Sequence, residues 1–163
     1  MINSKRKECV VLRPYGARIR NPVFRALGRC GIVPRAENIF EDSLSDQEIC
    51  MLLSESDYDL ILCPFKAVRL PDGSTTDGLK LLQTIRRERP LLLRVPVFMP
   101  ISQFSGGVFE SHWRNGSDGF ETPGNDLKNA ILVIRESELT DEEAVANRMQ
   151  QHMQQFGNAS LSV

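Results

Sequence analysis

The chain has 163 residues, of which 41% are hydrophobic and 25% charged, and its formal net charge is -1. This composition excludes a wholly disordered chain, and the length suffices for one domain with a buried core. The balanced charge gives no overall bias toward nucleic acid, and no apolar run is long enough to span a membrane.

Four cysteines lie far apart in apolar segments, at Cys9, Cys30, Cys50 and Cys63. They lack the close paired spacing of a zinc site. We therefore expect reduced thiols in a cytoplasmic protein, without a bound metal, a cofactor or a membrane association.

Charge is distributed unevenly along the chain. Basic residues are frequent between residues 5 and 35, and acids collect between residues 136 and 143. This asymmetry predicts either a basic docking surface or an ordinary solvated surface.

The first elements are a strand and a helix. The continuous apolar run at 8–12 is typical of a strand that is covered on both faces. Asn21 and Pro22 then form a helix start, and Gly31 is a helix-ending residue. A weaker second strand follows at 38–40.

A second helix and a central strand come next. Ser45 and Glu48 form a capping box in front of an apolar helical stripe. The run at 58–63 is nearly all apolar and is stopped by Pro64, which predicts the central strand of a sheet.

Turn residues fill the segment 70–76, and Asp77 then caps a third helix. A fourth strand is predicted at 95–101, followed by a short, irregular fourth helix around 108–113. Residues 119–122 predict a brief fifth strand.

An apolar stripe over 127–134 predicts a fifth helix. Strands and short helices therefore alternate five times. This alternation predicts an α/β fold, a doubly wound five-stranded parallel sheet with helices on both faces.

The last part of the chain is predicted as a separate unit. We expect a receiver-like domain at 1–137, an extra amphipathic C-terminal helix at 138–156 and a flexible tail at 157–163. Thr140 and Glu143 form a capping box for that helix. Its apolar stripe either pairs with a partner helix or folds back on the domain, and it consists of Val145, Met149, Met153 and Phe156.

Four segments resemble the receiver domain of bacterial two-component response regulators, over roughly residues 8–136. The segments 59–62 and 95–99 resemble its third and fourth strands. The segment 77–82 resembles the opening of its third helix, and 116–120 the entry to its fifth strand. The resemblance implies the strand order 2-1-3-4-5.

Receiver chemistry, as the resemblance implies it, needs several groups at one edge of the sheet. Two acids after strand one and an aspartate ending strand three hold magnesium, and that aspartate accepts the phosphoryl group. A hydroxyl after strand four and a lysine after strand five stabilise the phosphoryl oxygens.

In this sequence the corresponding positions hold other residues. The acid pair is replaced by Arg13 and Pro14, and the aspartate by Pro64 or, in a second register, by Ala67. The hydroxyl position falls on Ile101, with Ser102 beside it, and the lysine position falls on Thr122 or Pro123. We therefore expect a degenerate pseudo-receiver that is not an enzyme.

The resemblance implies a signalling module that binds a protein partner, or a second copy of itself as a homodimer. Its face would be formed by helix four, strand five and helix five. The candidate contact residues are Val108, His112, Trp113, Phe120 and Glu121, although Trp113 and Phe120 fit a core role equally well.

Other functions stay open. Arg13 could hold an anionic small molecule at the old phosphate site, and Asp72 or Asp77 could accept a phosphoryl group in place of the missing aspartate. An enzyme or cofactor protein on the same fold would require a phosphate or flavin site that the sequence does not reveal. A nucleic-acid-binding regulator would use the basic N-terminal region, although we do not expect direct binding of nucleic acid.

Overall fold

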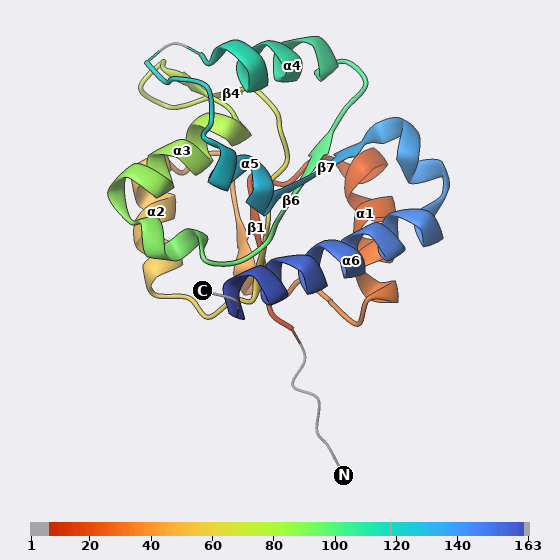
Figure 1. Ribbon diagram of the computed structural model, residues 1–163. Coiled ribbons are helices and arrows are strands. Elements are labelled where there is room, and N and C mark those ends of the chain that lie inside the picture. Colours follow the sequence, from red (N-terminus) through yellow and green to blue (C-terminus); the bar gives the residue numbers. More distant parts are fainter. Residues whose placement is uncertain (1–6, 118, 162–163) are drawn as a thin grey trace.

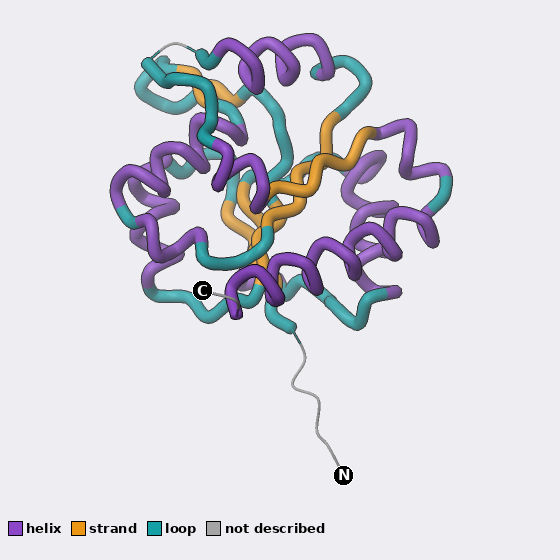
Figure 2. The backbone as a smooth tube through the Cα atoms, in the orientation of Figure 1, coloured by secondary structure: helices purple, strands orange, loops and turns teal. Residues whose placement is uncertain are grey.

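A computed structural model describes residues 7–117 and 119–161, the last five of them by their backbone alone. A five-stranded parallel sheet in the order β2-β1-β3-β6-β7 forms its centre (Figure 2). The predicted fold class and strand order are therefore confirmed. The strands are β1 (Cys9–Leu12), β2 (Ile39–Phe40), β3 (Leu60–Leu62), β6 (Val97–Ile101) and β7 (Ile131–Arg135).

Helices cover both faces of the sheet (Figure 1). On one face, α1 and α6 pack against alternate strand residues such as Val11, Leu62 and Phe98. On the other face, α2 and α3 pack against the intervening residues such as Val10 and Ile61. The α-helices are α1 (Ala17–Arg29), α2 (Asp46–Ser54), α3 (Gly78–Glu88), α4 (Gly106–Asn115), α5 (Asn125–Ala130) and α6 (Glu142–Leu161).

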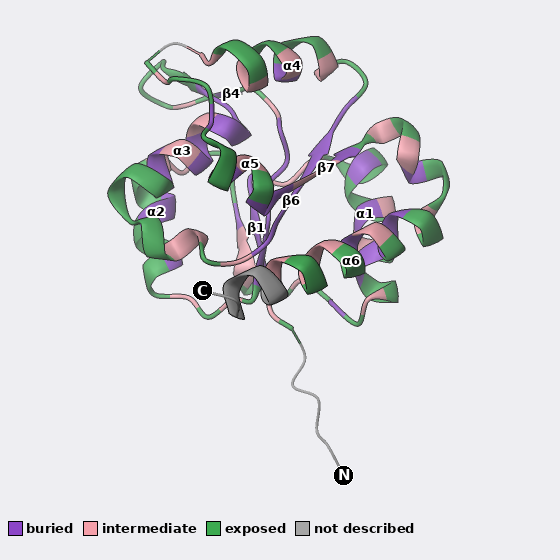
Figure 3. Cartoon of the chain, viewed as in Figure 1, coloured by how far each residue is buried: buried purple, intermediate pink, exposed green. Residues whose placement is uncertain are grey.

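Three 3-10 helices complete the helical segments: η1 (Ala36–Asn38), η2 (Pro90–Leu93) and η3 (Glu136–Thr140). The strands β1, β3 and β6 are buried along their whole length (Figure 3). This burial explains why they read as continuous apolar runs rather than alternating ones. Within the described part of the chain, no helix combines the length and apolar character needed to cross a bilayer.

An antiparallel hairpin is inserted between β3 and α3. It pairs β4 (Val68–Arg69) with β5 (Thr75–Thr76), and its turn is closed by hydrogen bonds from the Ser74 backbone and hydroxyl to Asp72 Oδ1. Gly73 adopts a φ of 88°, which glycine allows without strain. The predicted turn at 70–76 is thus the tip of a hairpin.

Several predicted helix ends are confirmed. Ser45 and Glu48 form the capping box of α2, and Asp77 caps α3 by accepting a hydrogen bond from the Lys80 N–H at 2.9 Å. Gly31, with a φ of 77°, follows Cys30, the C-cap residue of α1. Local hydrogen-bonding chemistry was sufficient to predict these three positions.

The predicted start of α1 is wrong. The helix begins at Ala17, so that Pro22 lies inside it. Proline removes one backbone hydrogen bond from a helix. The additional first turn is stabilised because Ile19 is buried against the sheet.

The predicted fifth strand is also wrong. Residues 119–122 lie in the loop after α4, where an isolated bridge joins Ser117 to Phe120. The fifth strand of the sheet is β7, and the apolar stripe predicted as one helix is divided between α5 and β7. A short apolar run fits either helix or strand by its spacing alone, which explains the error.

The C-terminal helix packs against α1 and the sheet. Val145 and Met149 are buried there, and Met153 packs against the same core cluster. Of the two arrangements predicted for this stripe, the structure has the one in which it folds back onto the domain, and Phe156 is half-buried. The helix is capped by Asp141, which accepts a hydrogen bond from the Ala144 N–H, rather than by the predicted Thr140 box.

The helix also extends to Leu161, beyond its predicted end. Residues 162 and 163 of the predicted tail lie outside the described residues.

Candidate functional site

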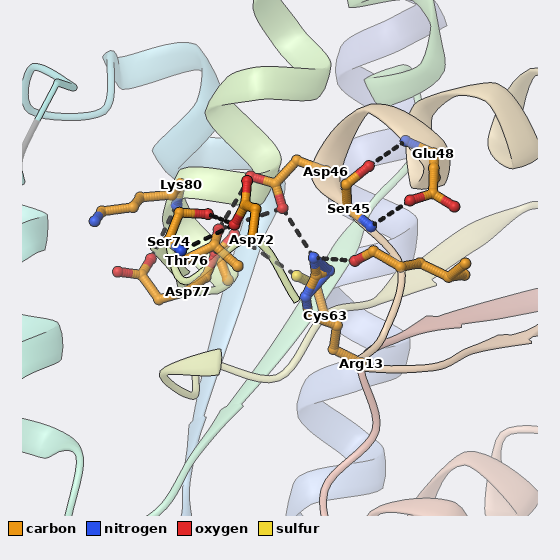
Figure 4. Close-up of polar contacts among 12 residues, drawn as sticks. Arg13, Ser45, Asp46, Glu48, Cys63, Asp72, Ser74, Thr76, Asp77 and Lys80 are labelled. Atoms are coloured by element: carbon orange, nitrogen blue, oxygen red, sulfur yellow. Dashed lines mark hydrogen bonds and ion pairs between the residues drawn. The ribbon is translucent and has the colours of Figure 1, made fainter. Parts of the chain in front are cut away.

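The carboxyl ends of β1, β3 and β6 meet at one edge of the sheet, where ligands bind in open α/β folds. Arg13 follows β1, Cys63 and Pro64 follow β3, and Ser102 follows β6. The hairpin and the first turn of α2 border the same region (Figure 4).

Arg13 fills the centre of this region. Its side chain is only 2% exposed, and Nη2 donates hydrogen bonds to the Leu44 carbonyl at 2.6 Å and to Asp46 Oδ1 at 3.0 Å. Figure 4 shows the guanidinium directed toward Asp46. A cation therefore occupies the space next to the end of β1.

The conformation of Arg13 is costly. Its φ is 55°, in the left-handed region that residues other than glycine rarely adopt. Its Nε and Nη1 atoms are buried and meet no hydrogen-bond acceptor among the residues that the structure describes. A buried cation with a strained backbone and unsatisfied N–H groups persists only when neighbouring groups stabilise its charge.

Asp46 is the ion-pair partner of Arg13. Asp46 begins α2, where the positive end of the helix dipole favours a carboxylate. The Thr76 hydroxyl donates to Asp46 Oδ2 at 3.0 Å, so the hairpin is tied to the same group. Burial raises the pKa of Asp46, while Arg13 and Thr76 act in the opposite direction.

Asp77 connects the site to α4. One carboxylate oxygen caps α3, and the other, Oδ2, lies 2.9 Å from His112 Nδ1. His112 Nδ1 is buried and forms no hydrogen bond with the residues that the structure describes, so this contact is close without being a hydrogen bond. Asp77 is buried, with both oxygens engaged.

Two further sets of contacts join the loops after β1 and β3 at this edge of the sheet. Lys66 Nζ donates to the Pro14 carbonyl at 2.6 Å and to Asp42 Oδ2 at 2.9 Å. The Tyr15 hydroxyl donates to the Phe65 carbonyl, and burial raises the pKa of Tyr15 to about 12. The loops after β1 and β3 are thus joined to each other.

The Cys63 thiol is fully buried next to Arg13 and Asp77. Burial raises the pKa of Cys63 far above its ordinary value. A thiol that does not ionise is a poor nucleophile, so Cys63 acts here as a core residue.

No protein-family model and no curated protein matches the chain. Among solved structures, it is similar to the signal receiver domain of an HD domain-containing protein from Pseudomonas fluorescens, with 12% identity, a TM-score of 0.60 and coverage of 100% of this chain and 98% of that chain. A response regulator receiver protein from Sinorhizobium medicae is 9% identical with a TM-score of 0.53, covering 95% of this chain and 97% of that one.

The chain has the receiver-domain fold. A receiver domain from Methylobacillus flagellatus agrees, with 14% identity, a TM-score of 0.50 and coverage of 91% of this chain and 99% of that chain. At such identities the likeness extends to the fold alone, and function has to be argued from the residues of the site.

In the receiver fold, the end of β3 is the position of the phosphoryl-accepting aspartate. Here β3 is followed by Cys63 and Pro64, and Phe65 still pairs with β6. Pro64 therefore lies just beyond the strand, while Ala67 is exposed and leads into the hairpin. Neither residue carries a nucleophile.

The residue directly after β6 is Ser102, whose hydroxyl is engaged with another side chain. Ile101 is buried as the last residue of β6, and the Ser102 hydroxyl is 3.0 Å from that of Ser105. In the described residues, no group of three or more His, Cys, Asp or Glu side chains could hold a metal ion. Asp46 and Asp77 are instead engaged with protein groups.

The lysine position must be corrected together with the fifth strand. Thr122 and Pro123 lie in the loop between α4 and α5, and the Thr122 hydroxyl donates to the Arg114 carbonyl. The residue that ends β7 is Arg135, which is exposed and paired with Glu110. The Arg135 guanidinium thus lies at this edge of the sheet, but it pairs with Glu110 of α4.

The predicted contact residues separate into two groups. Val108 on α4 is exposed, whereas Trp113 on the same helix is half-buried against Phe109 and Lys128. Phe120 and Glu121 lie against α3, where Arg87 covers the Phe120 ring and Gln83 donates to the Glu121 carbonyl. The prediction that these two share a face with α4 through strand five is wrong, because that strand is β7.

Sequence reasoning missed Asp46, Thr76 and Lys66. Each is a common surface residue type, and each acquires its role from a partner far away in the chain. A weak signal existed for Asp46, since the positive end of the helix dipole favours an acid in the first turn of a capped helix.

Proposed function

We propose that this chain is a receiver-fold signalling module that works without phosphorylation, by binding a protein partner. The observation that carries the proposal is Arg13, a buried cation ion-paired to Asp46 beside the end of β1. Receivers need carboxylates there to hold magnesium.

The charge of Arg13 opposes metal binding directly. A divalent cation would have to approach a fixed guanidinium in a poorly solvated region, where charge repulsion is strong. Displacing Arg13 would break a buried ion pair, which costs about 3–5 kcal/mol. Pro64, at the position of the phosphoryl-accepting aspartate, has no nucleophile for phosphoryl transfer.

The partner would bind the face formed by α4, β7 and α6, which we call the output face. Its strand β7 is at the edge of the sheet. One ion pair joins Arg135 of β7 to Glu110 of α4, and another joins Arg148 of α6 to Glu138 of η3. A partner protein is the main candidate for this face, and a second copy of the chain, giving a homodimer, is the other.

The alternatives have less support. Asp77 is buried as the cap of α3, and Asp72 accepts hydrogen bonds within the hairpin turn, which lower its pKa. Both acids thus have structural roles. An anionic ligand at Arg13 would compete with Asp46 and would lie near Asp77.

Binding of nucleic acid is opposed by pairing of the basic residues. Arg18, Arg25 and Arg35 form ion pairs with Glu136, Glu142 and Glu8. Lys5 and Arg6 of the same basic stretch lie outside the described residues. All four cysteines are free, which fits the reducing cytoplasm in which the proposal places the protein.

The test is treatment of the full chain with magnesium and a small phosphodonor such as acetyl phosphate, followed by intact-mass measurement. We expect no added phosphoryl group under conditions that fully label an active receiver in the same tube. A stoichiometric, hydroxylamine-sensitive phosphoryl adduct on any aspartate would refute the proposal.

A further inference from the structure

The segment around α2 is acidic and contains no base of its own. Residues 41–59 include no Lys, Arg or His. Their seven acids are Glu41, Asp42, Asp46, Glu48, Glu55, Asp57 and Asp59. Two of these are paired, Asp42 with Lys66 and Asp46 with Arg13, and Asp59 accepts a hydrogen bond from the Glu8 N–H. The other four are exposed, and none of them forms an ion pair with a described residue.

Two of the unpaired acids share one face of α2 with two exposed apolar side chains. The four residues are spaced i, i+3, i+4 and i+7, which places them on the same side of a helix, and they are Glu48, Met51, Leu52 and Glu55. Met51 is 61% exposed and Leu52 is 36% exposed. The opposite side of the helix is buried in the core through Ile49, Cys50 and Leu53. The four exposed side chains therefore form one continuous surface, which we call the α2 stripe.

The charges of the α2 stripe are unfavourable in the free protein. Glu55 is the C-cap residue of α2, where the negative end of the helix dipole disfavours a carboxylate. Its charge also adds to those of Glu48 and Asp57 on the same side of the molecule. The neighbouring helix α3 brings no net cation, because burial raises the pKa of Cys50 to about 11, with Glu88 acting in the same direction and Arg89 in the opposite one. A cation supplied from outside would relieve this repulsion.

We propose that the α2 stripe is a docking site for a basic amphipathic segment of a partner protein, in which Lys or Arg stands next to apolar side chains. The apolar side chains would cover Met51 and Leu52, and methionine is enriched at protein interfaces. The basic side chains would form charge-assisted hydrogen bonds with Glu48 and Glu55.

This docking site goes beyond the function proposed above. The output face contains α6, and α2 and α6 cover opposite faces of the sheet (Figure 1). The strands β2 and β7 also form opposite edges of that sheet. A protein bound to the α2 stripe would therefore leave the output face accessible, and the module could join two partners.

The α2 stripe of a second copy does not supply the required cations. An isologous contact would bring Glu48 and Glu55 against the same residues of the other copy. Like charges in contact oppose association. Lys5 and Arg6 at the amino terminus of the chain lie outside the described residues and are the competing source of cations, which the test has to distinguish.

The test selects random linear peptides, displayed on phage, against the full chain. Fluorescence anisotropy then measures the affinity of the enriched peptides for purified variants. The variants are Met51→Ala, Glu55→Gln and Glu48→Gln, and glutamine at position 48 can still form the capping box of α2. The matched controls are Val108→Ala, which alters a side chain of α4 that is 53% exposed, and Glu143→Gln, which removes an exposed acid of α6.

We expect enriched peptides that combine Lys or Arg with apolar residues. Met51→Ala should weaken their binding by roughly tenfold, as for an interface anchor. Each glutamate variant should weaken binding by about threefold and reduce its salt dependence, because one ion pair is lost. The two control variants should bind as the wild type does. Circular dichroism checks that each variant is folded, which we expect because the altered side chains are exposed.

Three results would overturn the inference: no enrichment, enriched peptides without bases, or binding that Met51→Ala and the glutamate variants leave unchanged. Peptide binding that becomes tenfold tighter in the variant Lys5→Gln, Arg6→Gln would also overturn it, because the chain's own amino terminus would then occupy the stripe. Sedimentation showing a dimer that Met51→Ala dissociates would assign the stripe to a second copy instead. None of these results bears on phosphodonor labelling, so the two proposals fail separately.

Discussion

Arg13 concentrates several unfavourable features in one residue. It combines a left-handed backbone with a desolvated charge, and it is retained by Asp46, Leu44 and the hairpin residue Thr76. A buried ion pair of this kind rarely increases stability beyond what an apolar pair would give, but losing one member is costly. The pair therefore serves to fix the loops around it.

We predict that Arg13→Met lowers the free energy of unfolding by about 3–5 kcal/mol, because Asp46 is left buried without its cation. The double variant Arg13→Met, Asp46→Leu should recover a large part of this loss. Urea denaturation of both single variants and the double variant measures the coupling.

Burial already raises the pKa of Asp46. In Arg13→Met the loss should therefore shrink as pH falls and the carboxyl group becomes protonated. Additive effects of the two substitutions would contradict the role given to this pair.

This site was only half predictable from the sequence. The presence of Arg13, Pro14 and Pro64 at the positions where the resemblance to receivers leads one to expect acids is visible residue by residue. The pairing of Arg13 with Asp46 is not, because the two are far apart in sequence and their contact depends on the folded loops.

At the scale of elements, the edge strand β7 is protected by the last helix. Arg148 Nη2 donates to the Val133 carbonyl at 3.2 Å, and His152 Nε2 lies 2.8 Å from the Ala130 carbonyl. Exposed strand edges invite pairing with other chains. Arg148 thus occupies an acceptor of the edge strand, and His152 contacts the carbonyl at the end of α5, directly before β7.

We predict that His152 makes the protein less stable in mild acid. Burial lowers the pKa of His152 below its unfolded value of about 6.5, so the unfolded chain binds a proton first as pH falls. The stabilising contribution is complete above about pH 6.5 and is lost as pH falls through the folded pKa.

Urea midpoints of wild type and His152→Gln should diverge between about pH 7 and about pH 5.5. Glutamine retains a donor for the Ala130 carbonyl, so the variant should show the weaker pH dependence. All other ionisable groups are common to the two proteins, so their effects cancel in the comparison. Equal slopes for the two proteins would contradict this account of His152.

The elements themselves were predictable to different degrees. Helix caps at Ser45 and Asp77 and the buried runs of β1, β3 and β6 carry strong local signals. The run of Ile, Leu, Val and Ile in β7 is rich in β-branched residues, which favour strands. The helical spacing of Leu127 and Ala130 outweighed that signal, so the sequence reasoning extended the helix over β7. Without β7, the packing of α6 against α1 and the sheet could not be predicted.

At the scale of the whole molecule, the uneven charge of the sequence has a structural explanation. The basic residues of α1 and the acids near the start of α6 meet across one face, in the pairs Arg18–Glu136 and Arg25–Glu142. Exposed pairs of this kind contribute about 0–1 kcal/mol each. These ion pairs neutralise much of the positive charge that suggested a basic docking surface.

The global fold followed from the alternation of strands and helices, since right-handed crossovers leave few arrangements for a parallel sheet. What alternation does not determine is whether the edge of that sheet can still bind phosphate. In the function that we propose, the answer depends on the buried side chain of Arg13 and on Pro64 after β3.

The most direct measurement of the central claim is an amide NMR titration of the full chain with magnesium and beryllofluoride, which mimics a phosphoryl group on an aspartate. The account predicts no saturable shifts at Arg13, Asp46, Cys63 or Asp77. Saturable shifts clustered at these residues would show that the edge of the sheet still accepts the metal and the phosphoryl group, and would contradict it.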